Sequence, residues 1–206
     1  MQAKIRVWDW PVRIGHWLLV AGFVTAWLTG DSEEQRLIHV YAGGLMLGIV
    51  SFRLLWGFIG STHARFSDFV RGPRAVIDYL NSLLRGQPRH FTGHNPAGGW
   101  AIVALLALIL LGGVSGWLNY QELGGEWGGE WAENLHETAV HLLLAVVAVH
   151  LGGVLVGSLA HRENLVRSML TGSKQGQATD AIANARPLAA LAMLLWAVAL
   201  AWLLGR

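Results

Sequence analysis

The sequence predicts an all-α fold: a transmembrane helical bundle of four core helices with a fifth transmembrane helix at the C-terminus. Three observations lead to this fold class. The chain of 206 residues is 53% hydrophobic and only 14% charged, whereas soluble domains carry roughly 25% charged residues. It contains apolar runs long enough for helices to cross a bilayer. Its 11 Trp and 26 Gly also suit a membrane bundle, because Trp gathers at interfaces and Gly where helices approach closely.

The first expected crossing, residues 14–30, follows a basic segment in which Asp9 and Pro11 are suited to begin a helix. Because no A-x-A cleavage motif follows this run, we expect a retained helix rather than a cleaved signal peptide. After a short acidic loop, the second crossing covers residues 37–59 and has His39 near its start.

A long polar segment, residues 60–96, contains the piece PRAVIDYLNSLLRG, whose periodicity, Pro start and Gly stop predict an amphipathic helix at the membrane interface. The third crossing covers residues 97–118, and the fourth covers residues 135–160 after a glutamate-rich loop. An 18-residue apolar run forms the fifth crossing. We therefore expect a four-helix membrane domain over residues 1–186, with 60–96 as its cytoplasmic loop, and an additional helix over 187–206.

The basic residues predict the orientation of the bundle. Lys and Arg gather in the N-terminal segment, in residues 60–96 and in residues 161–186, whereas the two loops on the other side are acidic. The positive-inside rule therefore places the N-terminus in the cytoplasm and the C-terminus outside. The same distribution explains the sequence pI near 9.4. Membrane lipid is the expected surrounding, and nucleic acid is not an expected partner.

Four histidines lie at two depths of the expected bundle. His136 and His150 are 14 positions apart on the fourth helix, which is about 3.9 turns and roughly 21 Å of rise, so they project from nearly the same face. Depth places His16 with His150 near the cytoplasmic side, as an inner pair, and His39 with His136 near the opposite side, as an outer pair. Ionisable side chains inside a span indicate function by default. Hydrogen bonding to neighbouring helices is the alternative.

Two separated pairs suit haem better than zinc, because a closed zinc site gathers four ligands whereas haem iron takes axial ligands on opposite faces. We therefore expect a di-haem four-helix core with two non-covalent haem b groups, since the chain has no cysteine for covalent attachment or iron–sulfur clusters. Irons whose axial positions are both filled suit electron transfer. Three small-xxx-small pairs fit either close helix packing or room for porphyrin: Gly44 and Gly48, Gly112 and Gly116, and Gly153 and Gly157.

Other polar residues are weaker candidates. Arg13 and Arg53 near the inner level and Arg36 near the outer level could pair with haem propionates; snorkelling toward the interface is the alternative. His141 is about 140° round the helix from His136, which favours packing over a quinone site. The histidines in or beside cytoplasmic segments are expected to be solvated: His63, His90, His94 and His161.

These residues resemble the bacterial di-haem cytochrome b561 proteins, together with the b-type cytochrome subunits of nickel–iron hydrogenases. The matching pieces cover the first four helices: VWDWPVRIGHW, LIHVYAGGLMLGIVSFRLLWG, GHNPAGGW, and LHETAVHLLLAVVAVH with HRENLVRSMLTG. The family's four haem ligands carry over onto His16, His39, His136 and His150. The resemblance implies a protein of the bacterial cytoplasmic (inner) membrane that passes electrons between the quinone pool and a periplasmic partner. The fifth apolar run exceeds the four-helix form.

Three functions remain open from the sequence. The first is an electron-transfer subunit that exchanges electrons with quinone and with a periplasmic c-type cytochrome or similar protein; a hydrogenase is the alternative partner. The second is an enzyme like the family's superoxide:quinone oxidoreductase, which predicts a positively lined outer funnel. The third is a haem-free scaffold, which would require the four histidines to lie at matched depths by chance. The outer side is instead acidic and suits a basic partner, through Glu122, Glu126, Glu130, Glu133 and Glu137.

Overall fold

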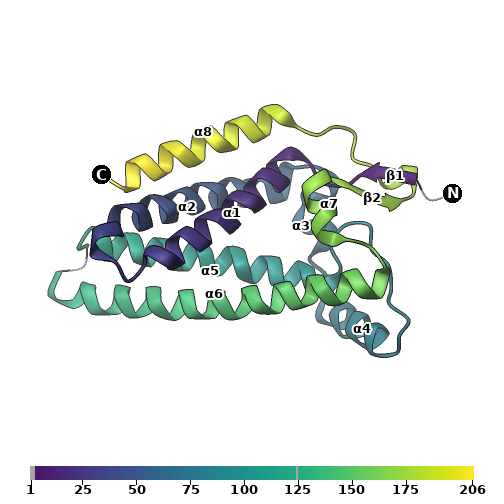
Figure 1. The fold of residues 1–206 in the computed structure, drawn as a ribbon, viewed down its shortest axis with the longest axis horizontal. Coiled ribbons are helices and arrows are strands. Elements are labelled where there is room, and N and C mark those ends of the chain that lie inside the picture. Colours follow the sequence, from purple (N-terminus) through teal and green to yellow (C-terminus); the bar gives the residue numbers. More distant parts are fainter. Residues whose placement is uncertain (1–2, 124) are drawn as a thin grey trace.

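The computed structural model describes residues 3–123 and 125–206, and the side chains of residues 125–129 lie outside the description. Five long helices run side by side (Figure 1), each long and apolar enough to cross a membrane. The predicted all-α transmembrane bundle with a fifth C-terminal helix is therefore confirmed, and the chain is a multi-pass membrane protein. The five helices are α1 (Trp10–Thr29), α2 (Arg36–Ile59), α5 (Pro96–Tyr120), α6 (Gly125–His161) and α8 (Pro187–Leu204).

Helix starts follow local chemistry. The carboxylate of Asp9 caps α1 by accepting from the backbone N–H of Val12 at 3.0 Å, and Asn95 caps α5 through the N–H of Gly98 at 2.8 Å. The prediction for the fourth crossing was short at its start, because α6 begins at Gly125 rather than at residue 135. An apolar run marks only the membrane-embedded part of a helix, and here the acidic residues before that part are helical too.

Most short elements gather at one end of the bundle, which we call the sheet end. Figure 1 shows this end on the right, opposite the C-terminus. Here β1 (Ala3–Arg6) pairs antiparallel with β2 (Ser173–Gly176), a pairing that the sequence analysis missed. The predicted interfacial helix is α4 (Pro73–Leu84). The remaining short elements are α3 (Phe66–Phe69), α7 (Leu165–Thr171), and the 3-10 turns η1 (Glu33–Gln35), η2 (Thr62–Ala64) and η3 (Ala178–Asp180), of which η1 follows α1 at the opposite end.

The fifth helix, α8, packs against α2 and α1 on one flank of the bundle (Figure 1). A Cβ added to Gly48 would lie 2.5 Å from Cα of Ala197, and one added to Gly44 would lie 2.9 Å from Cα of Ala201. This pair of glycines therefore serves close helix packing, one of the two predicted uses. The indole N–H of Trp196 also donates to the Ser51 hydroxyl at 2.8 Å.

Candidate functional site

The outer pair of histidines meets inside the bundle at the end opposite the sheet end. The ring centroids of His39 and His136 lie 5.9 Å apart at an interplanar angle of 73°. Nδ1 of His39 lies 2.9 Å from the Ala26 carbonyl oxygen, and Nδ1 of His136 lies 2.7 Å from that of Gly112. Since a carbonyl oxygen only accepts, each Nδ1 carries the proton and donates. Both Nε2 atoms are thereby left with their lone pairs available to a metal.

Small residues make room for these rings. A Cβ added to Gly116 would lie 2.7 Å from Nδ1 of His136, so the glycine allows the imidazole to lie against α5. The predicted glycine pair on α5 therefore serves the histidine directly, through the Gly112 carbonyl and the bare face of Gly116. A Cβ added to Gly43 on α2 would meet no atom within 4 Å. Its missing side chain leaves open space beside the pair.

That open space is a small, mainly apolar cavity of about 70 Å³ between α1, α2, α5 and α6. Its lining suits a hydrophobic group that is held by a few polar atoms. The lining residues are Phe23, Ala26, Trp27, His39, Gly43, Met46, Leu108, Ile109, Gly112, Gly113, His136, Val140 and Leu143.

The inner pair lies toward the sheet end. His16 on α1 lies within electrostatic range of His150 on α6, and its ring packs edge-on against Trp17 at 5.1 Å between centroids. Unlike the outer pair, His16 has an Nδ1 atom that is enclosed and has no hydrogen-bond partner. On α6, a Cβ added to Gly153 would meet no atom within 4 Å, so the helix is bare beside His150.

The three predicted arginines have different surroundings. Arg13 donates through Nη2 to the carbonyl oxygen of Leu170 at the end of α7, and its guanidinium lies 4.4 Å from the centre of the Trp10 ring. Arg36 is exposed and lies over the Tyr120 ring at 5.3 Å. Arg53 differs from both, because its Nη1 atom is enclosed and unpartnered.

Two histidines expected to be solvated are instead placed inside the sheet end, which corrects the sequence analysis. His63 is 7% exposed, and its ring nitrogens face the Asp68 carboxylate at 3.1 Å and the Asp180 carbonyl oxygen at 2.8 Å. His94 is partly buried, with Nδ1 enclosed and unpartnered. The Asp180 carbonyl oxygen that binds His63 lies 117 positions later in the sequence, so local polarity gave no sign of this burial.

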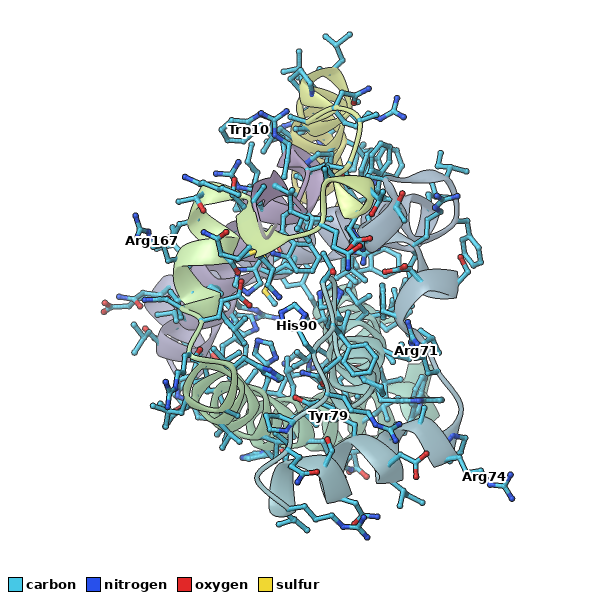
Figure 2. All side chains as sticks on the ribbon, turned by 90° about the vertical axis from the view of Figure 1, so that its right-hand side faces the viewer. Trp10, Arg71, Arg74, Tyr79, His90 and Arg167 are labelled. Carbon is cyan, nitrogen blue, oxygen red and sulfur yellow. The ribbon has the colours of Figure 1, made fainter. Side chains whose placement is uncertain are left out.

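His90 remains exposed, as expected, and Figure 2 shows it in the middle of the sheet end. The ring of His161 lies 5.6 Å from that of His90 between centroids. His141 is also exposed, and its Nδ1 donates to the Glu137 carbonyl oxygen one turn earlier at 2.8 Å. Its ring also lies edge-on to Trp27, with centroids 6.4 Å apart. These contacts fit the predicted packing role.

The opposite end of the bundle carries exposed acids. Glu130, Glu133 and Glu137 are exposed on α6 and share one face of the helix because they are three and four positions apart. We call these three residues the acidic face. Glu122 is exposed nearby in the sequence, and Glu126 lies outside the residues whose side chains are described.

The residues present fit haem at the outer pair. Two imidazoles bound to opposite sides of one metal by bonds of roughly 2 Å have ring centres about 6 Å apart, close to the 5.9 Å observed. Within the described part of the chain, no group of three or more His, Asp or Glu side chains could hold a metal. This arrangement suits a cofactor that brings its own equatorial ligands.

Comparison with known proteins gives one family and a set of relatives. Residues 7–172, which include all four histidines, match the family described as prokaryotic cytochrome b561. Relatives named "Probable Ni/Fe-hydrogenase B-type cytochrome subunit" include one from Rhizobium leguminosarum bv. viciae, 24% identical across 83% of this chain and 89% of its own length. Another, from Bradyrhizobium diazoefficiens, is 23% identical across 83% and 86%, and one from Azotobacter chroococcum is 24% identical across 83% and 88%. No solved structure matches the chain.

Proposed function

Because the chain belongs to the prokaryotic cytochrome b561 family, and is thus a membrane b-type cytochrome, we propose that it holds two haem b groups and carries electrons across the bacterial cytoplasmic (inner) membrane. His39 and His136 would hold the outer haem, and His16 and His150 the inner one. The observation that carries the proposal is the outer pair, whose imidazole ring centroids lie 5.9 Å apart in an edge-on arrangement, with each Nδ1 atom donating to a carbonyl oxygen. When bound, haem supplies one-electron redox chemistry.

The residues of the chain explain why transfer, rather than catalysis at iron, is the proposed activity. If both histidines of a pair held one haem, the iron would have no open position for a substrate. The carbonyl oxygens of Ala26 and Gly112 fix the orientations of the two imidazole rings. By accepting from Nδ1 they also make each Nε2 atom a more basic metal ligand. The apolar side chains around the outer pair exclude water, which limits side reactions at a redox centre.

The orientation supports quinone at the inner end and a protein partner at the outer end. The sheet end carries the basic loop segments and would face the cytoplasm, with the inner pair within reach of quinone in the bilayer. The acidic face would then lie on the periplasmic side. It suits a partner with a basic docking surface, and it argues against attraction of an anionic substrate such as superoxide.

For the periplasmic partner, the relatives' names favour a hydrogenase over the c-type cytochrome that we ranked first from the sequence. In membranes that contain this chain and a nickel–iron hydrogenase, adding hydrogen should convert the b-type haem to its ferrous form, which is seen in the visible absorbance spectrum. The His136→Ala variant should lose this reduction and keep direct reduction by dithionite. Reduction only by a c-type cytochrome would favour that partner instead.

Haem content tests the di-haem assignment. The purified chain should contain two b-type haems, His136→Ala should retain the inner one, and His150→Ala should retain the outer one. The control is His141→Ala, because His141 lies on the same helix, is exposed and contacts its own backbone; it should retain two. One haem or none in the unaltered chain would overturn the proposal. Loss of both haems from each single variant would show that the sites are not independent.

A further inference from the structure

Arg53 and His94 both contact one aromatic residue at the sheet end of the bundle, and each has one enclosed nitrogen without a hydrogen-bond partner. Both contact the fully buried ring of Phe69: the guanidinium carbon of Arg53 lies 5.8 Å from its centroid, and the His94 ring lies 4.8 Å from it. Nη1 of Arg53 and Nδ1 of His94 are enclosed and have no hydrogen-bond partner. Two unpartnered nitrogens against one aromatic ring point to a missing acceptor.

The nearest obvious counter-charge for Arg53 is already occupied. Asp9 interacts electrostatically with Arg53, but its two oxygens accept from other groups: Oδ1 from the Val12 N–H, and Oδ2 from Trp56 Nε1 and the Ser61 hydroxyl. Among the described residues Arg53 forms no ion pair. A guanidinium presents its donors in a fixed fork that matches a carboxylate. An enclosed guanidinium without such a partner is therefore suited to receive one from a ligand.

The surroundings of His94 hold it in place beside the inner pair. Its ring packs between Phe69 and Trp8, whose ring centroid lies 4.5 Å away, and it lies within electrostatic range of both Arg53 and His150. Burial, followed by the positive charge of Arg53, lowers the pKa of His94 well below its usual value. The ring is therefore neutral and can donate one N–H to an anion.

A second buried cation lies at this place. Lys174 on β2 is 6% exposed and interacts electrostatically with His94. Its ammonium group is already paired with the Glu163 carboxylate at 3.1 Å. Arg53, in contrast, has no carboxylate partner among the described residues. A carboxylate is the kind of group that could accept a hydrogen bond from the enclosed nitrogen of Arg53 and from that of His94.

We propose that Arg53 and His94 form a carboxylate receptor that binds a propionate group of the inner haem and positions it. The proposal rests on the proposed function, because it requires haem at His16 and His150. It adds His94, which the sequence analysis placed in solvent, as a positioning residue. It also separates Arg53 from Arg13, which is committed to the carbonyl oxygen of Leu170.

The test measures the midpoint potential of each haem by visible spectroelectrochemistry in the full-length protein, purified free of quinone. Loss of a cation beside a bound carboxylate favours the oxidised iron, so Arg53→Met should lower the inner potential and leave the outer potential unchanged. Arg53→Lys should restore most of the shift. Arg74→Met is the matched control, because Arg74 is an exposed arginine of the same end, and it should change neither potential.

The second variant, His94→Leu, removes the other donor, and His90→Leu is its exposed control in the same segment. His94→Leu should release inner haem to apomyoglobin about tenfold faster or more, as expected for loss of a hydrogen bond to a charged group. If Arg53→Met does not fold, the rate at which His94→Leu releases inner haem tests the proposal. His94→Gln, which keeps an N–H donor, should release haem at nearly the original rate.

Three results would overturn the proposal. The first is that neither variant changes the inner potential or the release of inner haem. The second is that changes occur only after a soluble quinone analogue is added, which would assign these two residues to a quinone site instead. The third is an unaltered chain that binds no inner haem, and this result alone would also defeat the proposed function.

Discussion

The carboxylate of Asp9 joins the first two helices, because its Oδ2 accepts a hydrogen bond from Trp56 Nε1 of α2 at 2.9 Å. The same oxygen accepts from the Ser61 hydroxyl at 2.6 Å, and Oδ1 caps α1 through the Val12 N–H. Asp9 is 0% exposed. One side chain therefore sets both where α1 begins and how it lies against α2, and through α1 it places His16.

Replacing this carboxylate should destabilise the protein strongly. Asp9→Ala removes a helix cap, which costs about 0.5–2 kcal/mol, and leaves buried donors unsatisfied at about 1–3 kcal/mol each. We expect a loss of about 3 kcal/mol in unfolding free energy, measured by denaturant titration in detergent. Asp31→Ala, at an exposed turn, is the control and should change it little. Equal stability of the two variants would contradict the role assigned to Asp9.

The contact between α2 and α8 should not tolerate even one methyl group. A Cβ on Gly48 would approach Cα of Ala197 to 2.5 Å, so Gly48→Ala forces the helices apart and should cost about 1–3 kcal/mol. Gly152→Ala is the control, because a Cβ there meets no atom within 4 Å, and it should stabilise by about 0.5–1 kcal/mol. Thermal unfolding of both variants checks this; a neutral Gly48→Ala would mean that α8 does not dock this closely.

His63 should make stability depend on pH. Burial lowers its pKa, but hydrogen bonds to the Asp68 carboxylate and the Asp180 carbonyl oxygen outweigh burial, so the folded pKa is raised above 6.5. A group whose pKa is higher in the folded than in the unfolded protein stabilises the fold fully when the pH is below its unfolded-state pKa. This stabilisation is lost as the pH rises through its folded-state pKa. The midpoint of thermal unfolding should therefore fall as pH is raised above about 6.5. The unfolding midpoint of the His63→Gln variant should depend less on pH. If the midpoint varies with pH identically in both proteins, His63 is not the group responsible.

The acidic face should steer a basic partner. Converting Glu130, Glu133 and Glu137 to Gln should slow association with a cationic redox protein about tenfold at low salt. The difference should shrink at high salt, because the screening length falls from roughly 10 Å at 0.1 M to 3 Å at 1 M. Asp78→Asn, at an exposed acid of the sheet end, is the control. Stopped-flow reduction rates provide the measurement, and a salt-independent difference would exclude electrostatic steering.

The absence of cysteine makes the orientation easy to test. A single cysteine introduced as Glu133→Cys should react with a membrane-impermeant maleimide in intact spheroplasts. One introduced as Arg74→Cys, on α4, should react only after lysis. The reverse pattern would invert the bundle and move the acidic face into the cytoplasm.

The sequence was sufficient to predict the five helices and the end at which His39 lies beside His136. Helices in a bilayer must satisfy their backbone internally, so apolar length marks each one, and depth along each helix then brings His39 to His136. The surroundings of His94 could not be predicted in this way. Its burial depends on Trp8 and Phe69, which lie far from it in the sequence.

A local signal for His94 was nevertheless present. Asn95 caps α5 and Pro96 is its first residue, so His94 is the residue just before the cap, a position at which hydrophobic side chains are often buried against the fourth residue of the helix. For β1 there was no such signal: the strand is four residues long, with a single buried side chain at Ile5. Only its partner β2, which is more than 160 positions later, makes it a strand.

This pairing imposes an order on biosynthesis. Ala3 is opposite Gly176 and Arg6 is opposite Ser173, so the N-terminal strand has no partner until the ribosome has made most of the chain. The first four long helices, which carry the inner and outer histidine pairs, are therefore made before β1 can pair with β2. A cofactor could thus enter the nascent bundle at the sheet end before β1 and β2 pair, and translation of β2, which follows α7, then allows this end to close.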